Sequence, residues 1–411
     1  MELIETLNRT MKLAMDEGMV GSYEEAQELF GSFRLRIRVQ PGFTTVPAAE
    51  AAVLTLLNAA PRTFLGGVEL VGPLDERCTR AWFTGMNLGE VAQYFGVSTN
   101  KDAIDEVPTI SIGECFTIEK DFCLGVSLHS DGFTLSPDHV VIGTPNSPVE
   151  AGIAAAGAAL NEAFQYIYRK SKLAGQRVIQ WKFPWKIQET SMRALWMIGL
   201  GHLGQAFFWA AALAGGDFLP RSIKLSDYDM VSWSSISTCL LVNAKDVGKK
   251  KVDVVAEQLE VLGVQVKRDY ERLELDSTIV RSEQDLAIVA VDNVALRRSL
   301  DRLHAIRILE AGIGDGAKAF TRIQMHAFPG PRKARDIWIE DDIRATQGVD
   351  LSKPAYQALL SKTGDECGTT LVAGRSVATP FVGAFAGAIL NVLAINPRCS
   401  DYAWNFDVAS L

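Results

Sequence analysis

The sequence predicts an α/β fold, with a Rossmann-like, mostly parallel sheet, helices on both faces and two pseudo-equivalent halves. The first observation is the segment ALWMIGLGHLGQAFFWAAALAG (194–215), in which an apolar run, three closely spaced glycines and a small-residue stretch are typical of strand, tight turn and helix. The second is that strand-like and helix-like segments alternate along the chain, as they do when helices cover a parallel sheet. The third is that residues 1–185 follow the order of residues 186–411 with weaker motifs.

Composition and charge narrow the class of protein. The 411 residues are 48% hydrophobic and 22% charged, as in ordinary globular proteins, and their net charge of −8 gives no attraction for nucleic acid or an anionic membrane. The apolar stretch 381–395 is shorter than the ~20 residues that span a bilayer. The N-terminus carries acidic residues and amphipathic spacing, so we expect no secretory signal and a cytoplasmic protein.

Cysteine and histidine spacing argues against a metal centre. The six cysteines form no CxxC pair, which excludes a zinc ribbon, and we expect them to be reduced thiols in a cytosol. They lie at positions 78, 115, 123, 239, 367 and 399. His129, His139, His304 and His326 show no metal-ligand spacing.

In the first half, helical spacing extends to about residue 33, with Ser22 as a plausible cap. Strand patterns follow at 33–39, 66–72, 107–113 and 122–143, with helices over 40–60 and 147–172. The segment QWKFPWKIQE (180–189) is interpreted as a crossing between the halves.

In the second half the same order has sharper signals. Strands are predicted within 194–198, 222–231, 264–273, 285–293 and 306–314, an antiparallel strand within 320–330, and helices within 202–215, 246–263 and 374–395. Polar groups at the carboxyl ends of parallel strands converge on a ligand crevice. This places the glycine turn, Asp227 and Asp292 on one rim of the sheet.

The glycine turn predicts a phosphate site at a helix N-terminus, and its neighbours favour ATP over NAD. Asp227, 23 residues after Gly204, is placed to hold ribose hydroxyls under either reading. Three lysines, 249–251, open a helix after Gly248, where cations are costly unless a polyphosphate is near. Asp292 ends a central strand, where a carboxylate can hold Mg²⁺ against that polyphosphate.

These residues resemble the ThiF/MoeB-type adenylating superfamily, which includes the ubiquitin-activating enzymes. The matching elements, in order over about 190–395, are the glycine loop, Asp-x-Asp, Gly-x-x-Lys, Asp-Asn and an arginine. The nucleotide-binding residues that the resemblance implies are Gly199, Gly201, His202, Gly204, Asp227, Lys251, Asp292, Asn293 and Arg297. Lys251 and Asp292 would be catalytic, and Asp292 would be the Mg²⁺ ligand.

The resemblance implies ATP-dependent adenylation of the C-terminal carboxylate of a ubiquitin-like β-grasp protein, with a conjugating enzyme as a further possible partner. It also implies an inactive domain over 1–185 paired with an active domain over 186–411, within one chain or in a homodimer. In this family a thiol before the last helix receives the activated carboxylate. Cys367 matches in position, on a stretch bordered by glycine and threonine that predicts a mobile loop, and Cys239 is its rival, interpreted as a buried helical residue.

The sequence also departs from the family. The run SSISTCLL (234–241) has Ser235 and Thr238 where members carry asparagine and arginine, so an expected phosphate-binding arginine is missing. His202 stands where a third glycine is common and is interpreted as a residue on the loop surface. An inactive scaffold and a NAD-dependent oxidoreductase remain as alternatives, although no His/Asp or Tyr/Lys catalytic set supports the second.

Overall fold

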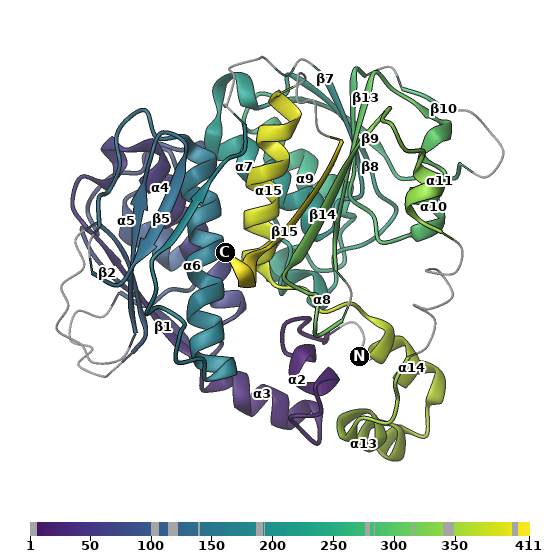
Figure 1. Ribbon diagram of the computed structural model, residues 1–411, viewed down its shortest axis with the longest axis horizontal. Coiled ribbons are helices and arrows are strands. Elements are labelled where there is room, and N and C mark those ends of the chain that lie inside the picture. Colours follow the sequence, from purple (N-terminus) through teal and green to yellow (C-terminus); the bar gives the residue numbers. More distant parts are fainter. Residues whose placement is uncertain are drawn as a thin grey trace.

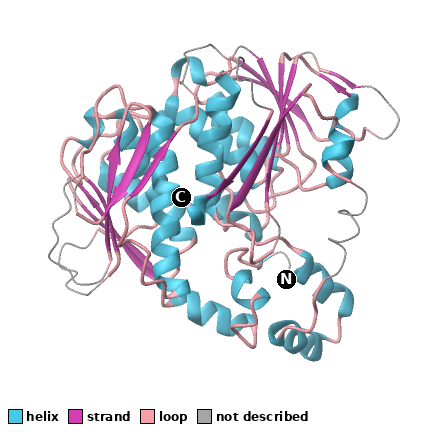
Figure 2. Ribbon diagram, in the orientation of Figure 1, coloured by secondary structure: helices cyan, strands magenta, loops and turns pink. Residues whose placement is uncertain are grey.

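The computed structural model describes residues 6–99, 107–113, 122–138, 140–185, 192, 194–275, 280–282, 284–314, 316–339, 349–396 and 402–411. Two α/β halves, each built on its own sheet, lie on either side of a central group of helices (Figures 1 and 2). Within the described residues, no helix is long and apolar enough to cross a membrane.

The sheet of the first half has the strand order β2-β1-β3-β4-β5-β6. Its strands are β1 (Arg34–Val39), β2 (Gly67–Val71), β3 (Thr109–Ile112), β4 (Cys123–Leu128), β5 (Gly132–Ser136) and β6 (Ile179–Lys182). Strand β6 corrects the interpretation of 180–189 as a crossing: residues 179–182 pair antiparallel with β5, and residues 186–189 lie outside the described residues.

The sheet of the second half has the order β15-β14-β13-β11-β7-β8-β9. Its strands are β7 (Ala194–Ile198), β8 (Ser222–Ser226), β9 (Gln265–Asp269), β11 (Leu286–Val289), β13 (Arg307–Ile313), β14 (Arg322–Phe328) and β15 (Ala403–Asp407). Strands β7 and β11 are apolar and almost wholly buried, as expected for parallel strands covered on both faces. A separate pair is formed by β10 (Val280–Arg281) and β12 (Leu303–His304).

The two sheets share one topology. Apart from the added edge strand β9, the order β2-β1-β3-β4-β5-β6 matches β8-β7-β11-β13-β14-β15 strand for strand. Strand directions match as well, with three parallel pairs followed by two antiparallel pairs in each sheet. The prediction of an α/β fold with two Rossmann-like halves is confirmed.

Four helices join the halves: α4 (Pro47–Ala59), α6 (Val149–Arg169), α7 (His202–Ala214) and α15 (Pro380–Ile395). Helix α6 packs on α4 in the first half and α15 on α7 in the second, while α6 and α15 pack on each other (Figure 1). These helices pack so closely that glycine is needed at the contacts. A Cβ at Gly152 would collide with the carbonyl oxygen of Ala48, and a Cβ at Gly387 would collide with that of Ala206.

The remaining helices are shorter. They are α2 (Lys12–Asp16), α3 (Tyr23–Gly31), α5 (Leu88–Tyr94), α8 (Trp233–Ile236), α9 (Lys251–Glu260), α10 (Val294–Arg298), α11 (Ala334–Ile337), α13 (Pro354–Thr363) and α14 (Glu366–Gly374). Ser22 caps α3 as predicted, because its hydroxyl oxygen accepts from the N–H of Glu25 at 3.1 Å.

The cysteines differ from expectation at one described position. Cys123 is disulfide-bonded, whereas Cys78, Cys239 and Cys367 are free. The expectation of six reduced thiols is therefore wrong for Cys123, because a spacing rule for CxxC pairs does not detect a disulfide closed by the fold. Cys115, Cys399 and His139 lie outside the described residues.

Candidate functional site

The glycine turn joins β7 to α7 at the rim of the second sheet. Gly199 has φ +92°, and a Cβ there would meet the carbonyl of Ala290 at 2.6 Å, so only glycine fits. Around Gly201 a Cβ would meet nothing within 4 Å, so space is open in front of the turn. Helix α7 begins directly after it without a side-chain cap, which leaves the amide donors of its first turn available to an anion.

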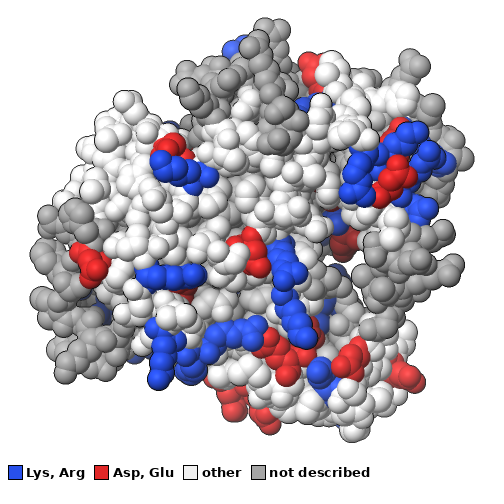
Figure 3. Space-filling view, viewed as in Figure 1, with Lys and Arg blue, Asp and Glu red and all other residues white. Residues whose placement is uncertain are grey.

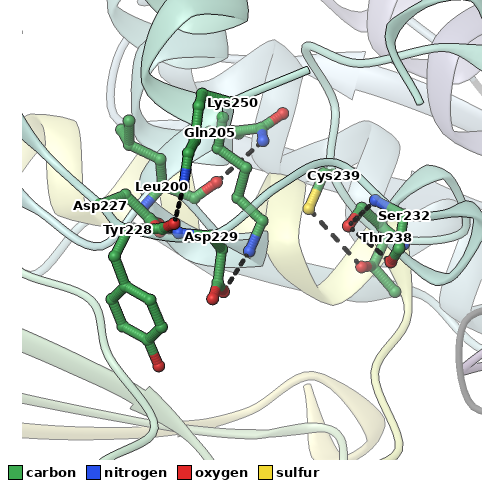
Figure 4. Close-up of polar contacts among 11 residues, drawn as sticks. Leu200, Gln205, Asp227, Tyr228, Asp229, Ser232, Thr238, Cys239 and Lys250 are labelled. Carbon is green, nitrogen blue, oxygen red and sulfur yellow. Dashed lines mark hydrogen bonds and ion pairs between the residues drawn. The ribbon is translucent and has the colours of Figure 1, made fainter. Parts of the chain in front are cut away.

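Asp227, the first residue after β8, ties the turn to the neighbouring strand. Its Oδ2 accepts from the N–H of Leu200 at 2.6 Å and its Oδ1 from the N–H of Asp229 at 2.8 Å (Figure 4). Gln205 holds the other side of the turn, because its Nε2 donates to the carbonyl of Leu200 at 2.8 Å. The turn, the end of β8 and the start of α7 thus form one hydrogen-bonded unit.

Lys251 is the lysine of the 249–251 run that belongs to this unit. It opens α9, is buried, and places its Nζ 2.7 Å from the Oδ2 of Asp229. Burial disfavours its charged form, but the carboxylates of Asp227 and Asp229 outweigh burial and hold the pKa of Lys251 above its ordinary value. Lys249 instead pairs with Asp246 at 3.0 Å, and Lys250 donates to the carbonyl of Tyr228 at 2.7 Å.

Asp292, Asn293 and Arg297 follow β11 on the same rim and have different surroundings. Asp292 is exposed. Asn293 caps α10, since its Oδ1 accepts from the N–H of Leu296 at 3.1 Å. The Nε of Arg297 donates to the carbonyl of Val291 at 2.8 Å and lies 3.1 Å from the Oε1 of buried Glu310. Asn293 and Arg297 therefore already have internal partners.

His202 is not on the surface of the loop, which corrects that interpretation. It is 8% exposed, and its ring lies against α15, where a Cβ at Gly383 would collide with it. Burial is the largest cause that lowers the pKa of His202, to about 3, and the charge of Arg9 adds to it. A neutral, buried imidazole at the start of α7 belongs to the contact between α7 and α15.

The sequence reasoning missed Arg9. Its backbone N–H donates to the Oγ of Ser237 at 3.2 Å, and its Nε donates to the carbonyl of Ser376 at 3.0 Å. Ser237 lies in the run 234–241 that lacks an arginine, and Ser376 lies between α14 and α15. The charge of Arg9 also contributes to the pKa of His202 and of Cys239, which places it near the glycine turn. Arg9 lies 190 positions before Gly199, where that turn begins, so no local motif signals it.

The two candidate thiols differ in exposure. Cys367 is exposed and lies in the first turn of α14, after the cap Asp365, so the prediction of a mobile loop is wrong at this position. Cys239 is buried, as expected, but in a turn after α8 and not in a helix. Burial raises the pKa of the Cys239 thiol, which disfavours the reactive thiolate.

The first half has a different arrangement at the equivalent turn, between β1 and α4. The carboxylate of Glu76 accepts from the N–H of Gly42 at 2.8 Å, from the N–H of Thr44 at 3.1 Å and from the hydroxyl of Thr44 at 2.6 Å. The Glu76 carboxylate therefore already occupies N–H and hydroxyl donors of this turn in the first half.

No group of three or more His, Cys, Asp or Glu side chains that could hold a metal ion occurs within the described part of the chain. Mg²⁺, however, is commonly held by one or two carboxylates together with substrate phosphates. Asp292 and the half-exposed Asp229 at this rim fit that requirement.

Comparison with known proteins identifies the class of protein to which this chain belongs. The Bacterial E1-like protein BilD of Collimonas sp. (strain OK412) is 33% identical over 403 residues, which cover 93% of this chain and 87% of that protein. The family models for the BilD N-terminal and C-terminal domains match residues 34–183 and 192–396. The chain is thus an E1-like protein. It belongs to the BilD family.

Two solved structures are also similar to parts of the chain. SeMet PaaA is 23% identical, with a TM-score of 0.25, and the match covers 32% of this chain and 40% of PaaA. E. coli MccB with MccA-N7isoASN is 13% identical, with a TM-score of 0.33, and the match covers 53% of this chain and 64% of MccB.

Proposed function

We propose that this chain activates the C-terminal carboxylate of a ubiquitin-like β-grasp protein by ATP-dependent adenylation. One observation carries the proposal: an open glycine turn and an uncapped helix N-terminus lie beside Asp227 and a buried, charged lysine. This combination offers backbone donors and a cation to phosphates, and it offers a carboxylate to ribose hydroxyls. Membership in an E1-like family supports the same chemistry.

In the proposed reaction, a carboxylate oxygen of the partner attacks the α-phosphorus of ATP. A new bond forms between that oxygen and the α-phosphorus, the bond from the α-phosphorus to the α,β-bridging oxygen breaks, and pyrophosphate leaves with the bonding electron pair. The amides at the start of α7 and the ammonium of Lys251 stabilise the charge on the phosphates. Asp292 would hold a Mg²⁺ ion, which would supply further charge neutralisation when bound.

Arg9 is the proposed substitute for the arginine that the run 234–241 lacks. Its contacts with Ser237 and Ser376 bring a guanidinium from the N-terminal segment to the rim of the second sheet. A guanidinium is well suited to phosphate oxygens because it is permanently charged and offers several donors. The inactive-scaffold alternative depended mainly on this missing cation.

The first half is proposed to support and dock the second without catalysis. Its turn after β1 is already bound by Glu76, and no residue equivalent to Lys251 follows β2 in the sequence. The matched topology of the two sheets makes the chain a pseudo-dimer of a non-catalytic and a catalytic half.

Cys367 is the proposed acceptor of the activated acyl group. Its thiolate would attack the acyl carbonyl of the adenylate, the bond from that carbonyl to the phosphate oxygen would break, and AMP would leave. Its thiol is exposed in the first turn of α14, where an incoming acyl group can reach it. A conjugating enzyme would then take the acyl group from the thioester.

The experiment is ATP–pyrophosphate exchange with a candidate β-grasp protein as the partner. We expect Lys251→Ala to lower the exchange rate ten- to a hundredfold, because a charge-assisted contact is worth roughly 1.5–3 kcal/mol. Lys249→Ala is the matched control, since Lys249 lies on the same turn but pairs with Asp246. Equal exchange rates in the Lys251 and Lys249 variants would show that the phosphates are bound elsewhere.

A further inference from the structure

A cavity of about 310 Å³ lies between the two halves, apart from the glycine turn. Its walls come from the end of α4 and from η3 (Ala81–Phe83) and α5 in the first half, and from α7, α9 and the segment 236–244 in the second. None of Gly199, Asp227, Lys251 or Asp292 lines it. Its volume is at the lower end of the range of about 300–1,000 Å³ for small-molecule sites, so it suits one small molecule.

The wall of the cavity is aromatic. Trp82, Phe83, Tyr94, Phe95 and Trp209 contribute to it. The Trp82 and Trp209 rings are stacked with their centroids 5.8 Å apart, and the Phe83 and Phe95 rings lie 5.5 Å apart. Trp82 is fixed in place, since its Nε1 donates to the carbonyl of Gln258 at 2.8 Å. These rings offer faces and edges to a flat apolar ligand.

One cation, Arg62, faces this aromatic wall without an acidic partner among the described residues. Its guanidinium donates to the carbonyls of Ile236 at 2.5 Å and Val242 at 3.1 Å, and to the Oδ1 of Asn58 at 2.8 Å, all of which are uncharged. No Asp or Glu is among the residues that line the cavity. Burial lowers the pKa of Arg62 to about 10, so the group is still charged near neutral pH.

A charge removed from water is costly unless an opposite charge accompanies it. The guanidinium of Arg62 has neutral acceptors for most of its donors but no counter-ion in the cavity. A ligand that complements this site therefore carries one negative charge beside a flat apolar ring.

We propose that this cavity is a binding site for a small aromatic carboxylate, with the carboxylate beside Arg62 and the ring against Trp82, Phe83 and Phe95. We assign a free small molecule because the walls come from both halves of the chain, and a third probe below tests the aromatic side chain of a partner protein as the other occupant. The site is separate from the proposed nucleotide site. The two sites share the segment 236–244, which Arg62 holds at Ile236 and Val242 and which Arg9 contacts at Ser237.

The test uses two probes of the same shape, indole-3-acetate, which is charged, and indole-3-acetamide, which is neutral, titrated into the full chain by calorimetry. We expect the carboxylate to bind at least tenfold more tightly than the amide, the difference typical of a charge-assisted contact. A peptide that ends in tryptophan is the third probe. Tighter binding of that peptide than of indole-3-acetate would overturn the assignment to a free small molecule.

Two variants locate the binding. Ala244→Trp places a large ring at the exposed mouth of the cavity and should abolish binding of indole-3-acetate without removing a buried contact. Arg62→Gln should weaken binding of the carboxylate at least tenfold and leave binding of the amide unchanged. Arg268→Gln, which removes a partly exposed arginine paired with Glu260, is the control for lost positive charge and should bind as the wild type does.

Three results would overturn the proposal. Equal affinity for the acid and the amide, or unchanged binding in Ala244→Trp, would overturn the proposal, and so would no heat from 10 mM indole-3-acetate with the wild type. If Arg62→Gln fails to fold, the comparison of the two probes in the wild type and in Ala244→Trp still decides the matter.

Discussion

The backbone N–H of Arg9 donates to the Oγ of Ser237 at 3.2 Å, which joins the N-terminal segment to the turn that follows α8. The guanidinium of the same residue contacts Ser376, just before α15 begins. Arg9 thus links three segments that are far apart in the sequence at the rim where the glycine turn lies. In the proposed function, Arg9 supplies there the cation that the run 234–241 lacks.

Arg9→Gln should lower the rate of ATP–pyrophosphate exchange ten- to a hundredfold, because the variant loses a charge-assisted contact with phosphate but keeps the backbone contact with Ser237. Arg177→Gln is the control, since Arg177 is half exposed and lies beside Glu162. Melting curves of both variants separate lost chemistry from lost stability. An exchange rate in Arg9→Gln equal to that of the control would refute the role given to Arg9.

The sequence predicted the parts of the fold whose signals are local. Buried parallel strands such as β7 and β11 are short, continuous apolar runs, and the turn at Gly199 is marked by its glycines. It did not predict α5 or β6, because their patterns are short and depend on contacts with the rest of the half. Whether such an element forms depends on contacts with segments far away in the sequence, and a single sequence does not show which segments make contact.

The sequence predicted which residues lie on the rim of the candidate site, but it did not predict which residues contact one another there. The glycine turn and Asp227 come together, because strand ends in a parallel sheet share an edge. Lys251 reaches the same place from the start of α9, through its contact with Asp229. His202 was misplaced because a histidine in a polar-looking turn gives no sign that α15 will cover it. Cys367 was assigned to a loop because glycine and threonine disfavour helices, yet the cap at Asp365 starts one.

Charges of both signs are mixed on the surface of the protein. On the face shown in Figure 3, lysine and arginine side chains of the described residues are interspersed with aspartate and glutamate. Several exposed charges of the described residues are paired, for example Lys182 with Asp131 at 2.8 Å. Exposed pairs of this kind contribute little to stability.

The buried imidazole of His202 should make the protein sensitive to acid. Its pKa is lowered to about 3 in the folded chain, below the ordinary value of 6.5, so its stabilising contribution is complete above pH 6.5 and is lost as the pH falls toward 3. Between pH 7 and 5 this single group should lower the free energy of unfolding by about 2 kcal/mol. The measurement is urea unfolding at both pH values.

In His202→Asn this loss should be absent, so the stability difference between wild type and variant should shrink by about 2 kcal/mol between pH 7 and 5. His304→Asn removes an exposed imidazole and serves as the control. Parallel pH profiles for wild type and His202→Asn would contradict the buried, neutral state.

The acyl acceptor is tested on a non-reducing gel with ATP and the β-grasp protein. We expect a thiol-sensitive conjugate that disappears in Cys367→Ala while ATP–pyrophosphate exchange continues, because adenylation precedes transfer to the thiol. Cys239→Ala should keep the conjugate, since burial disfavours the thiolate of Cys239. Loss of the conjugate in Cys239→Ala alone would reassign the nucleophile.

The central claim is that the rim beside Gly199 binds ATP, and the most direct test is the melting temperature of the full chain with Mg-ATP or with NAD. A ligand that binds only the folded state raises the melting temperature, and the rise grows with the logarithm of the ligand concentration relative to Kd. We predict that Mg-ATP raises the melting temperature of the wild type, that the rise is reduced in Lys251→Ala but kept in Lys249→Ala, and that NAD has no effect. A rise with NAD and none with Mg-ATP would contradict the account and support an oxidoreductase.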